Sequence, residues 1–513
     1  MKLETLLRQV ETKSVIGRLD REVFGIESDH RKLNAGFAWI CYKGVKIDAH
    51  QFIPSALAAV SNRPTAIIAE ATATGVPGNL TYVQVANGRS ALAQIAANWY
   101  CRPAEDLDLI GITGTNGKTS TAYFIESVFQ AAQLNPAVIG TIGYRYGKVS
   151  LPSQTTTPDP LLLYRLLADI RQQKLQYVIM EASSQGLAQH RLDYLKFQVG
   201  VFTNLTQDHL DYHPSIEHYL QAKLRLFEQI DSSGVAVINT DLPVKITDRI
   251  GTTSTAPAIT YGFNGHPDVT ATNILPTSSG LTFQLSLGVG NIRTSLQRQI
   301  EIRLKLLGNY NIYNALAAAS VGLHYQIDLE TIKTGLETTV IPGRFESVDL
   351  GLPFMVIVDY AHTPDGLQNL LETAREATDR RLVVVFGCGG NRDAVKRPIM
   401  GEIATKTADY TILTSDNPRS EDPEQIIRQI MVGIHSTGVS GKYEMIVDRK
   451  AAIGRAIEIA KAGDLVVIAG KGHETYQEVE GVRLPFDDRQ VAAEYVGYTY
   501  SPSLARGEEG KPT

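Results

Sequence analysis

The chain has 513 residues, too many for a single hydrophobic core, so we expect about two to four domains. Its composition, 43% hydrophobic and 20% charged, is ordinary for a soluble globular protein, and a net charge of -5 gives no reason to expect nucleic-acid binding. No apolar run approaches the roughly 20 residues of a membrane span, and three scattered cysteines show neither metal-ligand spacing nor a disulfide framework, which favours a reducing cytoplasm.

The first part of the chain, up to about residue 105, alternates short apolar runs with turns. Apolar runs at 65–69 and 81–85 are followed by a helical pattern over 90–96. This alternation is typical of a small α/β domain. The segment 102–106 has the composition of a linker to the next domain.

A glycine-rich motif, G-T-N-G-K-T at 114–119, lies between an apolar run at 107–110 and a helical pattern. In a strand-to-helix turn of this kind, backbone N–H groups point at phosphates and the helix directs its positive end to the same place. Lys118 would supply a mobile cation and Thr119 a hydroxyl ligand for Mg²⁺. A strict Walker A motif would have its first glycine at Ile112, so an ordinary glycine-rich turn stays as the alternative.

Strands and helices alternate from the motif to about residue 340, as in a mostly parallel sheet. The apolar run 177–181 ends in Glu181, at the place of an acid that reaches Mg²⁺ from a neighbouring strand. A strand-end carboxylate that faces solvent is the alternative. The small polar residues that follow at 182–186 favour the metal-binding role.

Acidic and imidazole side chains cluster in T-Q-D-H-L-D-Y-H at 206–213, beside the expected strand ends where α/β sites form. Lys223 lies on the largely apolar predicted helix 215–230. It is either a surface lysine with a buried stem or a partly buried neutral amine that takes up CO₂ as a carbamate. Asn311 and Asn314, near the start of another predicted helix, either cap that helix or read an adenine edge.

The last segment starts a new alternation of strands and helices, which predicts a Rossmann-like domain. It lacks G-x-G-x-x-G, so dinucleotide redox chemistry is not expected. Charged loops follow its predicted strands at 359–362, 391–393, 416–419 and 470–474. Because such loops gather at one edge of a sheet, they indicate a polar, multiply charged ligand.

We therefore predict an α/β protein of three domains. A small N-terminal α/β domain covers 1–105, and a central P-loop ATPase-like domain with a mostly parallel sheet covers 106–340. A Rossmann-like C-terminal domain covers 341–513.

In order and over nearly the whole chain, these motifs resemble those of the Mur ligases, ATP-dependent enzymes that form amide bonds in peptidoglycan synthesis. The matching motifs are T-G-T-N-G-K-T at 113–119, E-A-S-S at 181–184, T-N-L-x-x-D-H-L-D-Y-H at 203–213, A-K at 222–223, G-x-x-N-x-x-N at 308–314, G-R-F-E at 343–346 and D-Y-A-H-T-P-D at 359–365. Within the family, three further motifs are similar to those of the members that add the third peptide residue: F-G-C-G-G-N-R-D at 386–393, D-N-P-R at 416–419 and G-K-G-H-E at 470–474. The arginine of D-N-P-R is similar to that of the form that adds meso-diaminopimelate and not lysine.

The resemblance implies that the substrates are ATP, UDP-N-acetylmuramoyl-dipeptide and meso-diaminopimelate, and that an acyl phosphate forms on the way. It implies a UDP-sugar-binding domain at 1–105, an ATP-binding domain at 106–340 and an amino-acid-binding domain at 341–513. We expect a cytoplasmic monomer that binds no nucleic acid and has no membrane span.

The resemblance also assigns roles to individual residues. The implied ATP contacts are Gly114, Thr115, Asn116, Gly117, Lys118, Thr119, Ser120, Asn314, Arg344 and Asp359. The implied contacts to the muramoyl-dipeptide are Thr156, Thr157, Ser183, Gln189 and Arg191. The implied contacts to diaminopimelate are Arg392, Asp416, Asn417, Pro418, Arg419, Gly470 and Glu474. The implied Mg²⁺ ligands are Thr119, Glu181, His209 and Lys223 as its carbamate, and the implied catalytic residues are Lys118, Lys223 and His209.

The chain departs from the family near its start, where Asp29-His30-Arg31 replaces the usual D-S-R and leaves the manner of UDP binding open. A folylpolyglutamate synthetase is one rival, although such enzymes usually carry G-K-G-S where this chain has G-K-T-S at 117–120. A nucleotide-dependent switch or inactive binding paralogue is another. Phosphate release that depends on both nucleotide-sugar and amino acid would separate a ligase from a switch.

Overall fold

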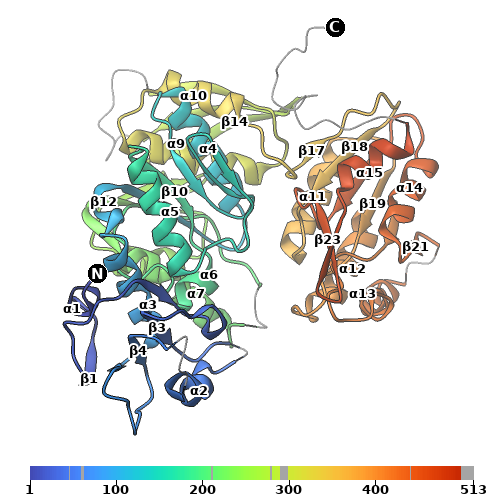
Figure 1. Ribbon diagram of the computed structural model, residues 1–513. Coiled ribbons are helices and arrows are strands. Elements are labelled where there is room, and N and C mark those ends of the chain that lie inside the picture. The colour runs from blue at the N-terminus through green and yellow to red at the C-terminus, as the bar shows by residue number, and fades with distance from the viewer. Residues whose placement is uncertain are drawn as a thin grey trace, which may run out of the picture.

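The protein is built from three main β-sheets that follow one another along the chain (Figure 1). The computed structural model describes residues 1–45, 47–58, 63–208, 212–277, 280–288, 298–438 and 441–497. In the view of Figure 1 the blue N-terminal sheet lies below the central sheet, and the orange to red C-terminal sheet lies to the right. None of the helices in these ranges combines the length and apolar character needed to cross a bilayer.

The N-terminal sheet is five-stranded within the described residues. Its order is β1 (Thr12–Ile16), β5 (Thr81–Val85), β4 (Ala66–Ala69), β3 (Phe37–Cys41) and β2 (Gly25–Glu27). The helical elements of this part are α1 (Leu3–Leu6), η1 (His30–Lys32), η2 (Ala49–Phe52), α2 (Ile53–Ala58) and α3 (Gly88–Trp99). The predicted linker forms a short 3₁₀ helix, η3 (Pro103–Asp106), which begins at a proline as helices commonly do.

The central sheet has eleven strands in the described part of the chain. Its order is β16 (Gln299–Leu304), β15 (Gly280–Leu287), β14 (Val269–Thr277), β13 (Ala258–Gly262), β12 (Ile230–Asn239), β11 (Phe197–Phe202), β6 (Asp108–Thr113), β10 (Tyr177–Glu181), β7 (Ala137–Ile139), β8 (Tyr144–Tyr146) and β9 (Val149–Leu151). The strands from β14 to β7 pair in parallel, and antiparallel hairpins extend the sheet at both ends. The predicted helix 215–230 begins one residue before α7 and ends two residues after it, because Ser215 is the N-cap and β12 begins at Ile230.

Helices cover both faces of the central sheet, which explains why β6 carries apolar side chains on both of its faces. Ile110 and Ile112 pack on the same face as α4 (Lys118–Ala131), α9 (Asn309–His324) and α10 (Leu329–Thr338). Leu109 packs on the opposite face with the remaining helices. These are α5 (Pro160–Gln172), α6 (Ser184–Ala188), α7 (Ile216–Glu228) and α8 (Val244–Thr253). A parallel sheet buried on both faces needs such continuous apolar strands.

The C-terminal sheet is six-stranded in the described residues, with β17 as its antiparallel edge strand. Its order is β17 (Glu346–Ser347), β18 (Met355–Asp359), β22 (Leu465–Ala469), β19 (Leu382–Phe386), β20 (Tyr410–Leu413) and β21 (Tyr443–Met445). The helices α11 (Pro364–Glu376), α12 (Lys396–Thr407) and α13 (Pro423–Ser436) cover one face, and α14 (Arg449–Ile459) and α15 (Asp488–Tyr495) cover the other. A separate hairpin consists of β23 (Tyr476–Val479) and β24 (Val482–Pro485).

Candidate active site

The glycine-rich motif forms the turn between β6 and α4. Gly114 has φ 146° and Gly117 has φ 85°, a region of backbone conformation that favours glycine. A Cβ atom at Gly117 would lie 2.4 Å from Oδ1 of Asn314, and one at Gly114 would lie 1.9 Å from Oγ1 of Thr203. Both glycines are therefore needed for space as well as for conformation, and the turn leaves the first N–H groups of α4 open to an anion.

The two polar side chains at the start of α4 have different partners. Nζ of Lys118 donates to the carbonyl of Gly114 at 2.9 Å and to that of Thr115 at 2.8 Å, so the side chain folds back over the loop. Burial lowers the pKa of this amine. Oγ1 of Thr119 donates to the Glu181 carboxylate, at 3.0 Å from each oxygen.

Glu181 faces the interior, so the alternative of a solvent-facing carboxylate is wrong. It ends β10 opposite Ile112 of β6 and is 2% exposed. Thr141 donates to it through its backbone N and its hydroxyl, both at 2.9 Å. The Thr119 hydroxyl and the Glu181 carboxylate are oxygen ligands of the kind that Mg²⁺ takes together with substrate phosphates. The described residues contain no cluster of three or more His, Cys, Asp or Glu that could hold a metal without such phosphates.

Lys223 is buried, which excludes the alternative of a surface lysine. The residue is 1% exposed, and its Nζ donates to the carbonyl of Gly114 at 2.7 Å and lies 4.2 Å from the ring centroid of Tyr219. Burial lowers the pKa of this amine well below its ordinary value, nearby Lys118 lowers it further, and Asp208 acts in the opposite direction. A neutral amine beside the phosphate loop is the form that reacts with CO₂. The predicted site residue His209 lies outside the described residues.

The residues predicted to hold the dipeptide lie together next to Glu181. Oγ1 of Thr157 donates to the backbone carbonyl of Glu181 at 2.8 Å and lies 2.9 Å from Oγ of Ser183. Arg191 donates to the Thr157 carbonyl at 2.6 Å and to Oε1 of Gln189 at 2.9 Å. Burial lowers the pKa of Arg191. Thr156 joins the same group through Thr141, whose hydroxyl is 3.0 Å away.

Asn314 lies against the start of α4 rather than capping its own helix. Its Oδ1 accepts from Oγ1 of Thr121 at 3.2 Å, and its Nδ2 donates to Oδ1 of Asn311 at 3.3 Å. The residue at the N-cap of α9 is Gly308, without a side-chain capping bond. The capping interpretation of these asparagines is therefore wrong, whereas the adenine contact stays a prediction.

Arg344 and Asp359 lie at the edge of the C-terminal sheet. Asp359 ends β18 and accepts from the backbone N of Phe345 and of Ala361, both at 2.7 Å. Burial raises the pKa of this carboxyl, and the nearby Arg344 acts against that shift. The Arg344 guanidinium lies 4.6 Å from the ring centroid of Tyr360.

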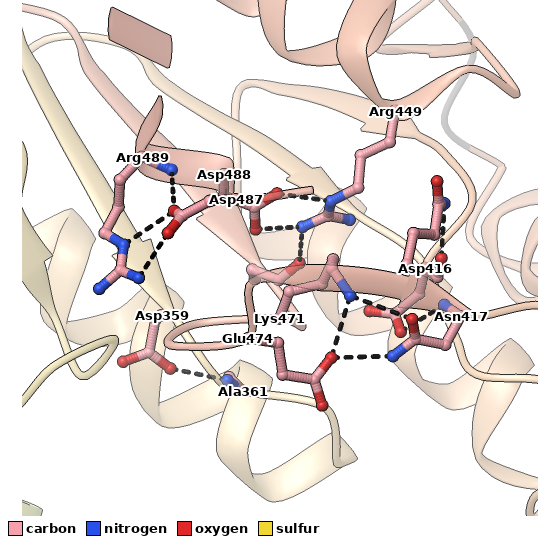
Figure 2. Close-up of polar contacts among 12 residues, drawn as sticks. Asp359, Ala361, Asp416, Asn417, Arg449, Lys471, Glu474, Asp487, Asp488 and Arg489 are labelled. Carbon is pink, nitrogen blue, oxygen red and sulfur yellow. Dashed lines mark hydrogen bonds and ion pairs between the residues drawn. The ribbon is translucent and has the colours of Figure 1, made fainter. Parts of the chain in front are cut away.

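Five of the predicted diaminopimelate residues lie in the loops that follow β20 and β22. Figure 2 shows three of them, Asp416, Asn417 and Glu474. Nδ2 of Asn417 donates to Glu474 at 2.8 Å, and the backbone N of Asn417 donates to Asp416 at 2.6 Å. A Cβ atom at Gly470, which has φ 115°, would lie 2.5 Å from Oδ2 of Asp416. The loop thus brings an amide and two carboxylates together at one point, with the fifth residue, Arg419, next to them.

The two predicted arginines both approach Gly389, but only Arg419 has polar partners. Nη1 of Arg419 donates to the carbonyl of Gly390 at 2.7 Å, and its Nε lies 3.4 Å from Oε2 of Glu478. Arg392 is exposed and makes no hydrogen bond or ion pair within the described residues. Pro418 lies between these groups in the loop, and its carbonyl accepts from Glu421 N.

Several site residues had no predicted role. Lys471 is fully buried, and its Nζ donates to Asn417 at 3.0 Å and to Glu474 at 2.9 Å. It belongs to the quoted G-K-G-H-E motif, which could have identified it. Asn116 N donates to Asn204 at 2.8 Å, and Asn116 Nδ2 donates to Asp365 of the C-terminal part at 2.7 Å.

A buried ion pair supports this edge of the C-terminal sheet (Figure 2). Arg449 donates to Asp488 through Nε at 2.8 Å and Nη2 at 2.7 Å, with both side chains 0% exposed. Nη2 of Arg449 also donates to the carbonyl of Ala469, one residue before Gly470. The pair therefore joins α14 and α15 to the loop that carries Lys471. Its partners lie far apart in the chain and in no motif, so this pair could not be predicted from the sequence.

Known proteins match the chain over nearly its whole length. Residues 112–322 match the Mur ligase middle domain, and 343–472 match the Mur ligase glutamate ligase domain. The UDP-N-acetylmuramoyl-L-alanyl-D-glutamate–2,6-diaminopimelate ligase of Syntrophomonas wolfei is 44% identical over 96% of this chain and 99% of its own. The enzyme of the same name from Bacillus cereus is 41% identical over 97% and 98%.

Solved structures agree with these matches and confirm the α/β fold. A structure of a UDP-N-acetylmuramoyl-L-alanyl-D-glutamate–2,6-diaminopimelate ligase has a TM-score of 0.65 at 33% identity, covering 97% of this chain and 99% of its own. Folylpolyglutamate synthase of Mycobacterium tuberculosis, complexed with ADP and AMPPCP, has a TM-score of 0.62 at 18% identity, covering 82% and 96%, which shows the shared fold alone. With a phosphate loop, a buried partner carboxylate and relatives of this identity over its full length, the chain belongs to the Mur ligase family.

Proposed function

We propose that the chain is an ATP-dependent ligase that joins meso-diaminopimelate to UDP-N-acetylmuramoyl-L-alanyl-D-glutamate in peptidoglycan synthesis. The names of its relatives support these substrates. The observation that carries the proposal is the position of Glu181, whose carboxylate accepts from Thr119 of the phosphate loop while its carbonyl accepts from Thr157 of the proposed dipeptide site. A phosphoryl donor and a carboxylate acceptor bound at these two places would lie next to each other.

The reaction would take place in two steps. A carboxylate oxygen of the D-glutamyl residue attacks the γ-phosphorus of ATP, the bond to the β-phosphate oxygen breaks, and ADP leaves. The neutral amine of diaminopimelate then attacks the acyl carbon of this acyl phosphate. The carbon–oxygen bond breaks, phosphate departs with the electron pair, and the amine loses a proton to give the amide.

The first step brings two anions together, which is unfavourable until their charge is compensated. We assign this role to Lys118 and the N–H groups at the start of α4, aided by Ser120 and the backbone amides of the loop. Thr119 and Glu181 would hold a Mg²⁺ ion, whose charge would further stabilise the phosphates. Asn314, Arg344 and Asp359 would complete the nucleotide site from α9 and from the C-terminal sheet.

We further propose that Lys223 is carbamylated and, with His209, holds a second Mg²⁺. The neutral amine that burial favours supports carbamate formation, and a carbamate would place a negative charge at this position, where it could bind a metal ion beside the phosphates. Nuclear magnetic resonance of protein equilibrated with ¹³C-labelled bicarbonate should show a carbamate signal that is missing from Lys223→Met. Exposed Lys148→Met is the control and should keep the signal. A spectrum of the wild-type protein without a carbamate resonance would contradict this assignment.

The amino-acid site is proposed at the edge of the C-terminal sheet. Diaminopimelate carries an ammonium and a carboxylate at its far end. Arg419 and Arg392 would bind that carboxylate, and Glu474 would accept from the ammonium. Lysine lacks the far carboxylate and would leave these cations without a ligand, which favours diaminopimelate. The three segments 1–105, 106–340 and 341–513 would then serve as UDP-sugar, ATP and amino-acid domains of a cytoplasmic monomer.

Phosphate release measured with ATP, Mg²⁺ and UDP-N-acetylmuramoyl-L-alanyl-D-glutamate tests the proposal. We expect turnover with meso-diaminopimelate, far less with lysine or ornithine, and none when the muramoyl-dipeptide is omitted. Mass spectrometry of the product should show the tripeptide. Phosphate release that does not depend on the amino acid would indicate a nucleotide-dependent switch. Turnover with lysine but not with diaminopimelate would reject the assigned amino acid.

A further inference from the structure

The hairpin β23–β24 lies along the loop that carries Arg419. The backbone N of Arg419 donates to the carbonyl of Glu478 at 3.0 Å, and the backbone N of Glu478 donates to Oδ1 of Asn417 at 2.9 Å. Glu480 N donates to the Arg419 carbonyl at 2.6 Å, and Gln477 Nε2 donates to the Asp416 carbonyl at 2.7 Å. The position of Glu478 relative to Arg419 is therefore fixed by main-chain contacts on both sides.

The carboxylate of Glu478 forms an ion pair with Arg419 and not with the other nearby arginine, Arg483. Its Oε2 lies 3.4 Å from Nε of Arg419, and both side chains are about one-quarter exposed, at 26% and 25%. Arg483 is its neighbour across the hairpin, but that guanidinium lies over the ring of Tyr476, 4.4 Å from the centroid. Within the described residues, the ion pair of Glu478 is thus directed at the proposed substrate site.

The ion pair with Glu478 changes which N–H groups of Arg419 are available to a ligand. A carboxylate binds a guanidinium best through two N–H groups of one edge, either Nε with Nη2 or Nη1 with Nη2. Glu478 faces Nε of the first edge, and the carbonyl of Gly390 accepts from Nη1 of the second. That carbonyl is held by the loop, because Gly390 N donates to the Asn417 carbonyl at 2.9 Å, whereas the Glu478 side chain can rotate away. A ligand carboxylate can therefore displace Glu478 from the Nε edge at a lower free-energy cost than it can displace the Gly390 carbonyl from the other edge.

We propose that Glu478 is a specificity-determining residue. Its carboxylate occupies the position on Arg419 that the far carboxylate of the amino-acid substrate would take. This inference rests on the proposed function. When diaminopimelate binds, its carboxylate must displace Glu478 or share Arg419 with it, and either outcome weakens binding. When lysine binds, Glu478 stays and Arg419 keeps a counter-charge. Glu478 therefore weakens the preference for diaminopimelate over lysine that Arg419 creates.

The test compares Glu478→Gln, which removes the charge at nearly constant size, with Glu480→Gln, the matched charge change in the same hairpin. In Glu478→Gln we expect KM for diaminopimelate to fall about two- to fivefold with kcat unchanged, the range for a partly exposed ion pair. The kcat/KM for lysine should fall by a similar factor, so the ratio of the two kcat/KM values should rise roughly tenfold. Glu480→Gln should leave both values unchanged.

Glu478→Asp keeps the charge but withdraws it by one methylene, and its ratio should lie between those of the wild type and Glu478→Gln. The inference is overturned if Glu478→Gln matches Glu480→Gln, or if its KM for diaminopimelate rises, because Glu478 would then only support the loop. Loss of kcat with both amino acids in a folded Glu478→Gln protein would overturn it as well. Wild-type enzyme without diaminopimelate-dependent phosphate release would instead reject the proposed function, and this inference with it.

Discussion

The phosphate loop and the amino-acid region both gather charged groups where parallel strands end, but these groups find their partners in different ways. At the phosphate loop, Lys118 donates to the carbonyls of Gly114 and Thr115, and Lys223 donates to the same Gly114 carbonyl. The Nζ atoms of both lysines therefore bond to main-chain atoms of one six-residue turn. Lys118 belongs to that turn, whereas Lys223 reaches it from α7.

In the amino-acid region, charged side chains bond to other side chains. Lys471 joins Asn417 to Glu474, and Arg419 faces Glu478 on a separate hairpin. These partners come from different loops and depend on how several strands pack. The phosphate site is thus organised around the main chain of one turn and would serve any amino-acid substrate, whereas the amino-acid site depends on side-chain pairs that a single substitution can change.

Substitution of Lys118 gives the largest expected effect and tests the phosphate side of the comparison. Lys118→Met keeps the length of the side chain but removes the cation proposed to stabilise the transferring phosphoryl group. We expect kcat to fall about a thousandfold or more, because one well-placed charge contributes on this scale in phosphoryl transfer. The loss should be equal for diaminopimelate and for lysine, measured by phosphate release.

Exposed Lys148→Met in the turn between β8 and β9 serves as the control and should retain full activity. If Lys118→Met lost activity with only one of the two amino acids, the phosphate loop would not be independent of the amino-acid site, and the comparison would fail.

Arg419→Ala tests the amino-acid site and should selectively reduce the use of diaminopimelate. Removing the guanidinium leaves the far carboxylate of diaminopimelate without its proposed partner. We expect kcat/KM for diaminopimelate to fall about a hundredfold, while KM for ATP changes less than twofold. Arg428→Ala, an exposed arginine of α13 paired with Glu424, is the matched control. An unchanged kcat/KM for diaminopimelate in Arg419→Ala would reject the assignment of this residue.

The same contrast explains what the sequence could predict. The strand β10 has the predicted bounds, 177–181, because an apolar run buried on both faces of a parallel sheet is continuous in sequence. The turn from β6 to α4 was predicted for a similar reason, since its glycines and Lys118 are consecutive. Features formed by consecutive residues can therefore be predicted from the sequence.

Contacts between distant segments could not be predicted. Nothing near Lys223 in the sequence shows that its Nζ reaches Gly114, 109 residues away, so the sequence alone left a surface lysine open. Arg449 and Asp488 form their buried pair from two helices separated by β22 and a hairpin. Such pairs follow from tertiary packing, which neither periodicity nor motif spacing records.

The histidine His362 lies between the two regions and gives a smaller, pH-dependent effect. Burial lowers its pKa to about 4, with Lys396 adding to the shift and Asp208 of the central part opposing it. In the unfolded chain the pKa returns to its ordinary value of about 6.5, so the unfolded state binds more protons between these two values. The contribution of the neutral histidine to the free energy of unfolding is therefore fully present above pH 6.5 and is lost as the pH falls toward 4.

Between pH 7 and pH 5 the wild-type C-terminal part should lose roughly 1 to 2 kcal/mol more unfolding free energy than His362→Asn. Hydrogen exchange of the β19 amides is the suitable measurement, because both tryptophans, Trp39 and Trp99, lie in the N-terminal part. His435→Asn, an exposed histidine on α13, should follow the wild type. Equal pH dependence in His362→Asn and the wild type would contradict the buried neutral state.

The smallest effect is expected at the hydrogen bond from Asn116 Nδ2 to Oδ2 of Asp365 at 2.7 Å, which joins the phosphate loop to the C-terminal part. Asp365 lies in the first turn of α11, where the positive end of the helix favours its charge. Asp365→Ala removes the bond from the phosphate loop to the C-terminal part but leaves both proposed sites intact. We expect kcat/KM to fall about two- to fivefold, the scale of one charge-assisted hydrogen bond at a partly exposed site.

If the bond only brings the phosphate site and the amino-acid site together, the decrease should be the same with diaminopimelate and with lysine. Exposed Asp379→Ala, in the connection after the same helix, should have no effect. A loss confined to diaminopimelate would place Asp365 in the amino-acid site. A loss shared by both substrates would indicate that the two regions, although built differently, must meet at Asn116 for phosphoryl transfer and amide formation to follow each other.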